Sequence, residues 1–221
     1  MILKNETDGT VLRRQDEPLV SLTGVSPKIK IYPSYYLQKM PGTSQDLFLR
    51  EEVARKIVQT AEQLPDGLFL VLIDGWRSFE TQRFIYERTI RQFRAAGYSE
   101  NRIQKEITDF VACPSKDPVR PAPHYSGGAI DLTLADDHDW IDMGTGFDDF
   151  TERAHLDFFE GKTGLSDLER LARDHRRFLR DRMEGAGFTH YPTEWWHYSY
   201  GDRAWAREHQ TIPLYGGIER T

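Results

Sequence analysis

The sequence has 221 residues, 38% of them hydrophobic and 29% charged, and 29 basic against 35 acidic side chains give a formal net charge of −6. This balance is typical of a folded globular protein with one sizeable core and excludes a disordered chain. The acidic surplus predicts neither nucleic acid nor an anionic membrane as a partner. The single cysteine, Cys113, allows no disulfide within the chain.

The N-terminal segment, residues 1–25, is polar and rich in turn residues, so we expect an irregular arm or an edge. It lacks the apolar region of a signal peptide, and the chain has no run of about 20 apolar residues that could span a bilayer. These features predict a cytoplasmic protein. They also favour a single domain over 1–221, whose oligomeric state cannot be predicted.

The first half of the chain predicts alternating helices and strands. The expected elements are a short strand at 28–33, a helix over 47–64 stopped by Pro-Asp-Gly, a strand at 68–73, a helix that begins after Ser78 and runs to about Ala96, and a helix over 99–112.

The second half begins with the loop "CPSKDPVRPAP", 113–123, which four prolines exclude from regular structure. The expected elements after it are a strand at 127–134, a polar loop, a helix opened by the capping box Ser166–Glu169 and ended by Gly185 or Gly187, and a final hairpin of "FTHYP" and "EWWHYSY". This order lacks regular βαβ alternation. It therefore predicts an α+β fold with a mainly antiparallel central sheet flanked by helices.

The stretch "PHYSGGAIDLTL", 123–134, places a carboxylate inside an apolar strand. Alternation puts Asp131 on the face opposite Ile130 and Leu132. A tight turn at the glycines after His124 would fold this imidazole back over Asp131, so that the two side chains could bind one metal ion. The alternative is a surface strand with a polar outer face.

The stretch "TEWWHYSY", 193–200, places Glu194 and His197 three residues apart among aromatic residues. A buried carboxylate is costly unless a cation or a donor meets it. Two histidines, one carboxylate and an open position are typical of a catalytic zinc site, with Glu194 as a candidate general base. The alternative is a strand whose polar side chains face solvent.

Arg77 follows the apolar strand at 68–73 and the turn "DGW". A guanidinium at the end of a strand could hold a carboxylate or a developing oxyanion. The alternative is a salt bridge, for example to Asp74.

These motifs together resemble the zinc D-Ala-D-Ala dipeptidases, a group of the LAS metallopeptidases. The resemblance is carried, in order along the chain, by "DGWR" at 74–77, "H-x-x-G-x-A-x-D" at 124–131, "DMGTGFDDFTERAH" at 142–155, "RRFLRDRMEGAGF" at 176–188 and "EWWHY" at 194–198. It implies the α+β fold shared with Hedgehog proteins and peptidoglycan carboxypeptidases.

The resemblance also implies functions for individual residues. It implies that His124, Asp131 and His197 bind one zinc ion per chain, and that Glu194 is the general base and acid. Arg77 would stabilise the oxyanion. Asp148 would hold the free ammonium of a small dipeptide substrate.

Two departures from the family pattern put the exact substrate in question. Ala122 and Pro123 replace a usual serine and its neighbour before the first histidine, and Ser78 replaces a common proline. A substrate-binding tyrosine is also implied near the N-terminus, and Tyr32, Tyr35 and Tyr36 are equal candidates.

The function predicted from these residues is zinc-dependent hydrolysis of D-Ala-D-Ala or a related D-amino dipeptide, with a role in cell-wall metabolism. One alternative is a peptidoglycan D,D-carboxypeptidase or L,D-peptidase of the same superfamily, which would need export. Another is a catalytically silent zinc-binding module, although such a module would need neither Glu194 nor Arg77.

Overall fold

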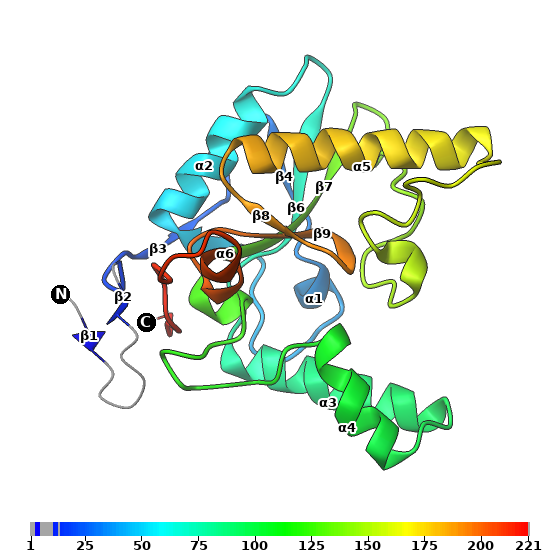
Figure 1. The fold of residues 1–221 in the computed structure, drawn as a ribbon. Coiled ribbons are helices and arrows are strands. Elements are labelled where there is room, and N and C mark those ends of the chain that lie inside the picture. The colour runs from blue at the N-terminus through cyan, green and yellow to red at the C-terminus, as the bar shows by residue number, and fades with distance from the viewer. Residues whose placement is uncertain (1–2, 5–10, 13, 221) are drawn as a thin grey trace.

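The structure is a computed structural model that describes residues 3–4, 11–12 and 14–220 (Figure 1). Its strands are β1 (Leu3–Lys4), β2 (Val11–Leu12), β3 (Leu19–Ser21), β4 (Ile29–Ile31), β5 (Phe48–Arg50), β6 (Phe69–Asp74), β7 (Ala129–Ala135), β8 (Thr189–Tyr191) and β9 (Glu194–Ser199). Its α-helices are α1 (Ser34–Leu37), α2 (Glu51–Glu62), α3 (Phe79–Ala95), α4 (Glu100–Phe110), α5 (Asp167–Gly185) and α6 (Arg203–Glu208), and two 3₁₀ turns are η1 (His124–Ser126) and η2 (Glu152–Ala154).

A five-stranded sheet in the order β4-β6-β7-β9-β8 forms the centre of the molecule. β4 pairs with β6 in parallel, and the other three pairs are antiparallel. The prediction of an α+β fold with a mainly antiparallel sheet flanked by helices is therefore confirmed. Two-stranded pairs β1–β2 and β3–β5 lie outside this sheet.

The two faces of the sheet are covered by different helices. α2 and α5 lie on one side of it, where the core contains the buried side chains of Ile130, Leu132 and Leu134 (Figure 1). α1 and the α3–α4 hairpin lie on the other side and form a second apolar cluster that includes Tyr35 and Ile85. The alternation expected along β7 is confirmed, because Asp131 points away from the main core.

The helix expected over 47–64 is wrong at its beginning. Residues 48–50 form β5, and the helix starts only at Glu51. β5 pairs with β3 at Leu19–Ser21, so residues 19–21 of the N-terminal segment, expected to be an irregular arm or an edge, form a strand. Most of that arm before residue 14 lies outside the described residues. Pairing between segments about 30 residues apart decides this conformation, and local helical spacing cannot reveal it.

The boundaries of the other helices are close to the predicted ones. The Ser78 side chain accepts a hydrogen bond from the Thr81 N–H, and the capping box of Ser166 and Glu169 is present. α5 ends at Gly185, one of the two predicted positions. The helix expected over 99–112 ends two residues earlier, at Phe110.

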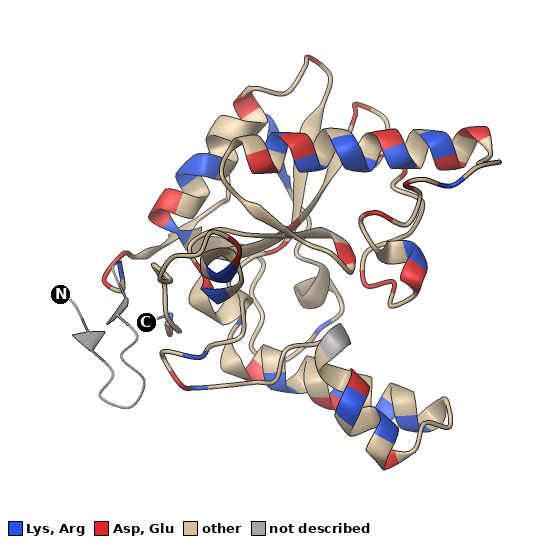
Figure 2. Cartoon of the chain, in the orientation of Figure 1, with Lys and Arg blue, Asp and Glu red and all other residues tan. Residues whose placement is uncertain are grey.

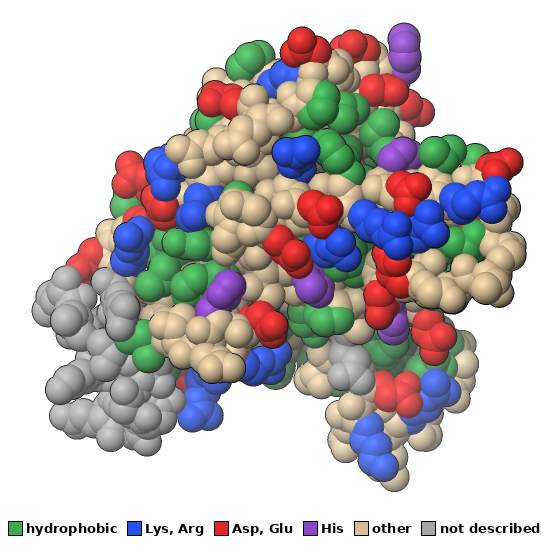
Figure 3. Space-filling view, turned by 45° about the horizontal axis from the view of Figure 1, so that its top comes forward, with side chains coloured by type: hydrophobic (Ala, Val, Ile, Leu, Met, Phe, Trp, Pro, Cys, Tyr) green, Lys and Arg blue, Asp and Glu red, His purple; other side chains and the backbone are tan. Residues whose placement is uncertain are grey.

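Charged side chains of both signs alternate along α5, the helix in the upper part of Figure 2. Arg177, for example, pairs with Glu160, and Arg180 pairs with Asp181. The face drawn in Figure 3 likewise mixes acidic and basic side chains. None of the described helices is long and apolar enough to cross a membrane.

Candidate active site

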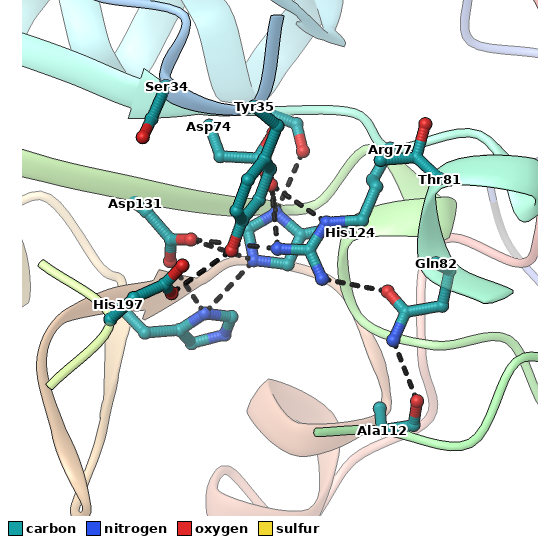
Figure 4. Close-up of polar contacts among 12 residues, drawn as sticks. Ser34, Tyr35, Asp74, Arg77, Thr81, Gln82, Ala112, His124, Asp131 and His197 are labelled. Carbon is teal, nitrogen blue, oxygen red and sulfur yellow. Dashed lines mark hydrogen bonds and ion pairs between the residues drawn. The ribbon is translucent and has the colours of Figure 1, made fainter. Parts of the chain in front are cut away.

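Three neighbouring strands place functional side chains in one row across the sheet. Asp74 at the end of β6 is the register partner of Asp131 on β7, which is in turn the register partner of His197 on β9. The Nδ1 atom of His197 lies 2.9 Å from Oδ1 of Asp131 (Figure 4). Side chains at paired positions share a face of the sheet, so this row lies on the side of α1 and the α3–α4 hairpin.

His124 reaches the same point from the 3₁₀ turn η1. Its Nε2 atom lies 3.4 Å from Oδ2 of Asp131 and 3.2 Å from Nδ1 of His197. The chain reverses at Gly127, whose φ of +73° favours glycine, and a Cβ atom there would lie 2.7 Å from a Leu19 methyl carbon. The turn expected from the two glycines therefore brings His124 over Asp131.

Hydrogen bonds on the outer nitrogens orient both imidazoles and fix the tautomer of His124. His124 Nδ1 lies 2.8 Å from the carbonyl oxygen of Gly75, which can only accept, so Nδ1 donates. The Ser199 hydroxyl donates to Asp202 at 2.8 Å, so at 3.4 Å from His197 Nε2 it can only accept from that nitrogen. The inner nitrogens are His124 Nε2 and His197 Nδ1. The lone pair of His124 Nε2 points toward this group, whereas His197 Nδ1 lies 2.9 Å from Oδ1 of Asp131 and donates a proton to it in the absence of a metal ion. A bound metal ion would replace that proton.

The spacing of the inner atoms fits a tetrahedral zinc ion. Zinc bonds of about 2.0–2.1 Å place neighbouring ligand atoms roughly 3.3 Å apart. The three separations among His124 Nε2, His197 Nδ1 and the Asp131 carboxylate are 3.2, 2.9 and 3.4 Å. Burial alone would raise the pKa of Asp131, but the two imidazoles lower it well below its ordinary value. The carboxylate is therefore ionised and available as a ligand.

Glu194 begins β9 and lies beside this group. Its Oε2 atom is 3.9 Å from Nδ1 of His197, too far for a hydrogen bond. Burial, with added repulsion from Asp131 and Asp148, raises the pKa of Glu194 from 4.5 to about 7, although His197 opposes the shift. A carboxylate with a pKa near neutrality can take up and release a proton during a reaction.

Arg77 lies between Asp74 and Gln82 and faces the group formed by His124, Asp131 and His197 (Figure 4). Its Nε and Nη2 atoms both donate to Oδ2 of Asp74, at 2.9 and 2.7 Å, so the salt bridge considered from the sequence exists. Nη2 also lies 3.8 Å from Oδ2 of Asp131. Burial would lower the pKa of Arg77, but Asp74, Tyr35 and Asp131 raise it above its ordinary value, so this side chain remains a cation.

Asp148 lies in the loop after Gly144, and its backbone has a φ of +60° that is uncommon for a residue with a side chain. The Tyr35 hydroxyl donates to Oδ1 of Asp148 at 3.1 Å, and Arg88 lies 3.8 Å from Oδ2. Burial and Asp131 raise the pKa of Asp148 from 3.8 to about 6.

The three candidate tyrosines have different environments. Tyr35 is 4% exposed, and its ring lies 5.0 Å from the Arg77 guanidinium carbon. Tyr32 and Tyr36 are 43% and 42% exposed. Of the three, Tyr35 is the one that lines the pocket with Arg77 and Asp148.

A pocket of about 100 Å³ collects these side chains, below the roughly 300–1,000 Å³ typical of sites for drug-sized ligands. It brings together every site residue that the sequence analysis singled out: Arg77, His124, Asp131, Asp148, Glu194 and His197. Sequence reasoning missed several other members of the wall: Gln82, Ile85, Phe110, Phe150 and Tyr191. It also missed Ser199 and Asp202 behind His197. Gln82 lies in the first turns of the helix that follows Arg77, but this position alone does not show that its side chain faces Arg77.

The group of His124, Asp131 and His197 could hold a metal ion and lies beside Glu194, an arrangement typical of metal-dependent hydrolases. Comparison with known proteins identifies the family, because the model of the peptidase M15 family, described as D-Ala-D-Ala dipeptidase, matches residues 19–214. A D-alanyl-D-alanine dipeptidase of Synechocystis sp. is 30% identical over 92% of this chain and 92% of its own length. A second, from Enterococcus faecium, is 32% identical over 74% of this chain and 78% of its own. The chain belongs to the peptidase M15 family of D-Ala-D-Ala dipeptidases, a family of zinc metallopeptidases, and the resemblance seen in its motifs is confirmed.

Solved structures give more distant matches. VanYB in complex with D-Ala-D-Ala has a TM-score of 0.46 and 18% identity, covering 92% of this chain and 93% of that chain. The D,D-dipeptidase VanXYg, in complex with a phosphinate analogue of D-Ala-D-Ala, has a TM-score of 0.35 and 22% identity, covering 75% of this chain and 57% of that chain. The family assignment rests on the sequence comparisons.

Proposed function

We propose that this protein hydrolyses D-Ala-D-Ala or a closely related D-amino dipeptide with the help of one zinc ion. The observation that carries the proposal is the convergence of two imidazole nitrogens and an ionised carboxylate on one point. Beside that point lies a carboxylate whose pKa is raised to about 7. A hydrolase can use this carboxylate, Glu194, as a general base, whereas a binding module would have no use for it.

His124, Asp131 and His197 would hold the zinc ion. When bound there, the ion supplies Lewis-acid chemistry that polarises the scissile carbonyl and lowers the pKa of a water molecule. The hydrogen bonds from His124 to Gly75 and from His197 to Ser199 keep both rings turned toward the ion.

Glu194 would take the proton from the attacking water. The same carboxyl would then give this proton to the amine of the departing residue, which cannot leave as an anion. The raised pKa suits both steps, because it lies close to neutral pH in either direction of transfer.

Arg77 and Asp148 would divide the two polar ends of the substrate between them. The N–H groups of Arg77 would stabilise the negative charge that develops on the carbonyl oxygen. Asp148 would accept hydrogen bonds from the free ammonium of the first residue, held in place by the Tyr35 hydroxyl. A pocket of about 100 Å³ with an anionic end favours a small peptide that begins at its own N-terminus.

The relatives named above support D-Ala-D-Ala as the substrate. Ala122 is 3% exposed and precedes the pocket residue Pro123, and neither side chain can donate a hydrogen bond. At this position, the carboxylate end of the dipeptide would therefore have to bind groups other than a serine hydroxyl. We further propose that residues 1–221 act as one domain in the cytoplasm, on dipeptide released or consumed in cell-wall metabolism.

The test is to incubate zinc-loaded protein with D-Ala-D-Ala and measure free D-alanine, beside a panel of L,L-, L,D- and longer peptides. We expect two D-alanine molecules per dipeptide consumed and little release from an N-acetylated dipeptide. Faster cleavage of longer peptides would show that they, and not D-Ala-D-Ala, are the preferred substrates. Zinc binding without cleavage of any peptide would favour a catalytically silent module.

A further inference from the structure

Gln82 contacts the Arg77 guanidinium on the side away from Asp74 (Figure 4). Its side-chain oxygen Oε1 accepts a hydrogen bond of 2.8 Å from Nη1 of Arg77. Gln82 is 2% exposed, so no solvent competes for this contact. The residue lies on α3, five residues after Arg77, and it is not one of the three candidate metal ligands.

Counting donors shows what these contacts leave for a substrate. An arginine side chain carries five N–H groups. Asp74 takes the one on Nε and one on Nη2, and Gln82 takes one on Nη1. One N–H group on each Nη atom has no hydrogen bond within the described part of the chain. With both flanks held, the guanidinium plane is fixed and this free edge is presented to the pocket.

A second hydrogen bond fixes Gln82 itself. Its Nε2 atom donates to the carbonyl oxygen of Ala112 at 2.7 Å. A carbonyl oxygen can only accept, so the amide must turn Nε2 toward Ala112 and Oε1 toward Arg77. Ala112 follows the end of α4, and it lines the pocket together with Phe110 and Val111. Gln82 therefore connects the cation in the pocket to the wall formed by the α4 end.

We propose that Gln82 is a positioning residue that orients Arg77 toward the carbonyl oxygen in the transition state. This inference rests on the function proposed above for Arg77. Asp74 alone holds one edge of the guanidinium and leaves rotation about the remaining side-chain bonds open. Gln82 removes that freedom before substrate arrives, which is the condition under which a donor is most effective in catalysis.

The first experiment compares two substitutions of Gln82 in zinc-loaded protein. Gln82→Met fills the same space but cannot accept from Arg77, and Gln82→Glu keeps an acceptor oxygen. We expect Gln82→Met to lower kcat for D-Ala-D-Ala by about 10- to 100-fold with KM changed by less than about threefold, the usual loss for a residue that supports another. The affinity for a phosphinate dipeptide analogue should fall by a similar factor. Gln82→Glu should recover at least half of the loss on a logarithmic scale.

Thr89→Val is the matched control for damage to α3. Thr89 is fully buried on the same helix, and its hydroxyl donates to the Ile85 carbonyl oxygen at 3.0 Å. We expect this variant to keep the wild-type kcat and phosphinate affinity, and all variants to retain one zinc ion per chain. The proposal is overturned if folded, zinc-loaded Gln82→Met keeps the wild-type kcat, or if Gln82→Glu is no better than Gln82→Met.

A second readout needs no substrate. The Arg77 Nε–H signal in a ¹H–¹⁵N spectrum can be assigned by its loss in Arg77→Lys, and its exchange with water reports how firmly the guanidinium is held. We expect faster exchange in Gln82→Met and no change in Thr89→Val. If the wild-type protein is inactive but Gln82→Met still shows faster exchange at Arg77 Nε–H, the proposed function is rejected and the positioning of Arg77 by Gln82 stands. Unchanged exchange in Gln82→Met would reject the positioning whether or not the protein is a dipeptidase.

Discussion

Asp131 on β7 and His197 on β9 are partners in the antiparallel register, and 2.9 Å separates the carboxylate Oδ1 from the imidazole Nδ1. Both side chains are more than nine-tenths buried, and His124 completes the group from a turn outside the sheet. Strand pairing thus fixes two of the candidate ligands relative to each other before any metal binds. A preformed site of this kind loses little conformational entropy when the ion enters.

Replacing Glu194 by Gln should abolish proton transfer and leave the metal group intact. The amide has nearly the same shape as the carboxyl group but cannot take a proton from water. We expect kcat for D-Ala-D-Ala to fall by about 10²- to 10⁴-fold. Release of D-alanine and zinc content per chain are the two measurements. Loss of zinc together with activity would mean that Glu194 is a ligand instead of a base.

The stability of the zinc-free protein should depend on pH through Glu194. Burial raises its folded-state pKa from 4.5 to about 7, so the folded protein keeps a proton that the unfolded chain releases. This contribution to stability is fully present below pH 4.5 and is lost as the pH rises to about 7, by up to about 3 kcal/mol. Urea unfolding in the presence of a chelator should show this fall in wild type and a smaller one in Glu194→Gln. Equal pH dependence of the two proteins would contradict the assignment of this pKa.

Asp148→Asn should weaken the recognition of a free N-terminus. Asparagine tolerates the left-handed backbone conformation at this position, so the loop should keep its shape. A hydrogen bond between charged groups contributes about 1.5–3 kcal/mol, so kcat/KM for a free dipeptide should fall by about 10- to 150-fold. Cleavage of an N-acetylated dipeptide, already slow, should not change. An equal loss for both substrates would show that Asp148 acts on the structure of the pocket and not on the ammonium.

Arg50→Met should destabilise the protein more than any exposed arginine substitution. Arg50 is fully buried, and burial lowers its pKa to about 10. It donates to four backbone carbonyls, those of Gln15, Glu17, Ser126 and Gly216, and thereby joins both ends of the described chain to the turn that carries His124. Leaving these acceptors unpaired should cost at least about 3 kcal/mol of unfolding free energy.

The control for this substitution is Arg55→Ala, on the exposed face of α2. Arg55 has 51% of its side chain exposed and pairs with Glu52 one turn earlier. An exposed pair of this kind contributes little to stability, because water and salt screen it. Urea unfolding curves of the two variants should therefore separate clearly, and similar losses would show that the carbonyl contacts of Arg50 do not stabilise the fold.

Local patterns were sufficient to predict the elements that carry the candidate ligands. Alternation along β7 placed Asp131 opposite the core, and the glycines after His124 predicted its turn. The same reasoning failed at residues 48–50, because their pairing with β3 is a contact between distant segments. Local spacing reads the conformation of a segment, whereas its partner in the sheet is set by the whole fold.

The supporting residues could not be predicted for a related reason. Gln82 is a polar residue on a helix, and nothing in its sequence neighbours shows that it faces Arg77 and Ala112. Asp202 lies near the C-terminal end, and its hydrogen-bond connection to His197 runs through the Ser199 hydroxyl. The choice of Tyr35 over Tyr32 and Tyr36 likewise depended on burial, which three aromatic residues within five positions do not reveal.

X-ray absorption at the zinc edge can show whether His124, Asp131 and His197 hold one zinc ion. We expect one zinc per chain, two imidazole nitrogens and a carboxylate oxygen at about 2.0–2.2 Å, and an additional light ligand that exchanges with solvent. In His124→Ala and His197→Ala the imidazole signal should fall by half and zinc affinity should drop. A protein that takes up no zinc after loading, or a zinc shell without histidine, would contradict the account.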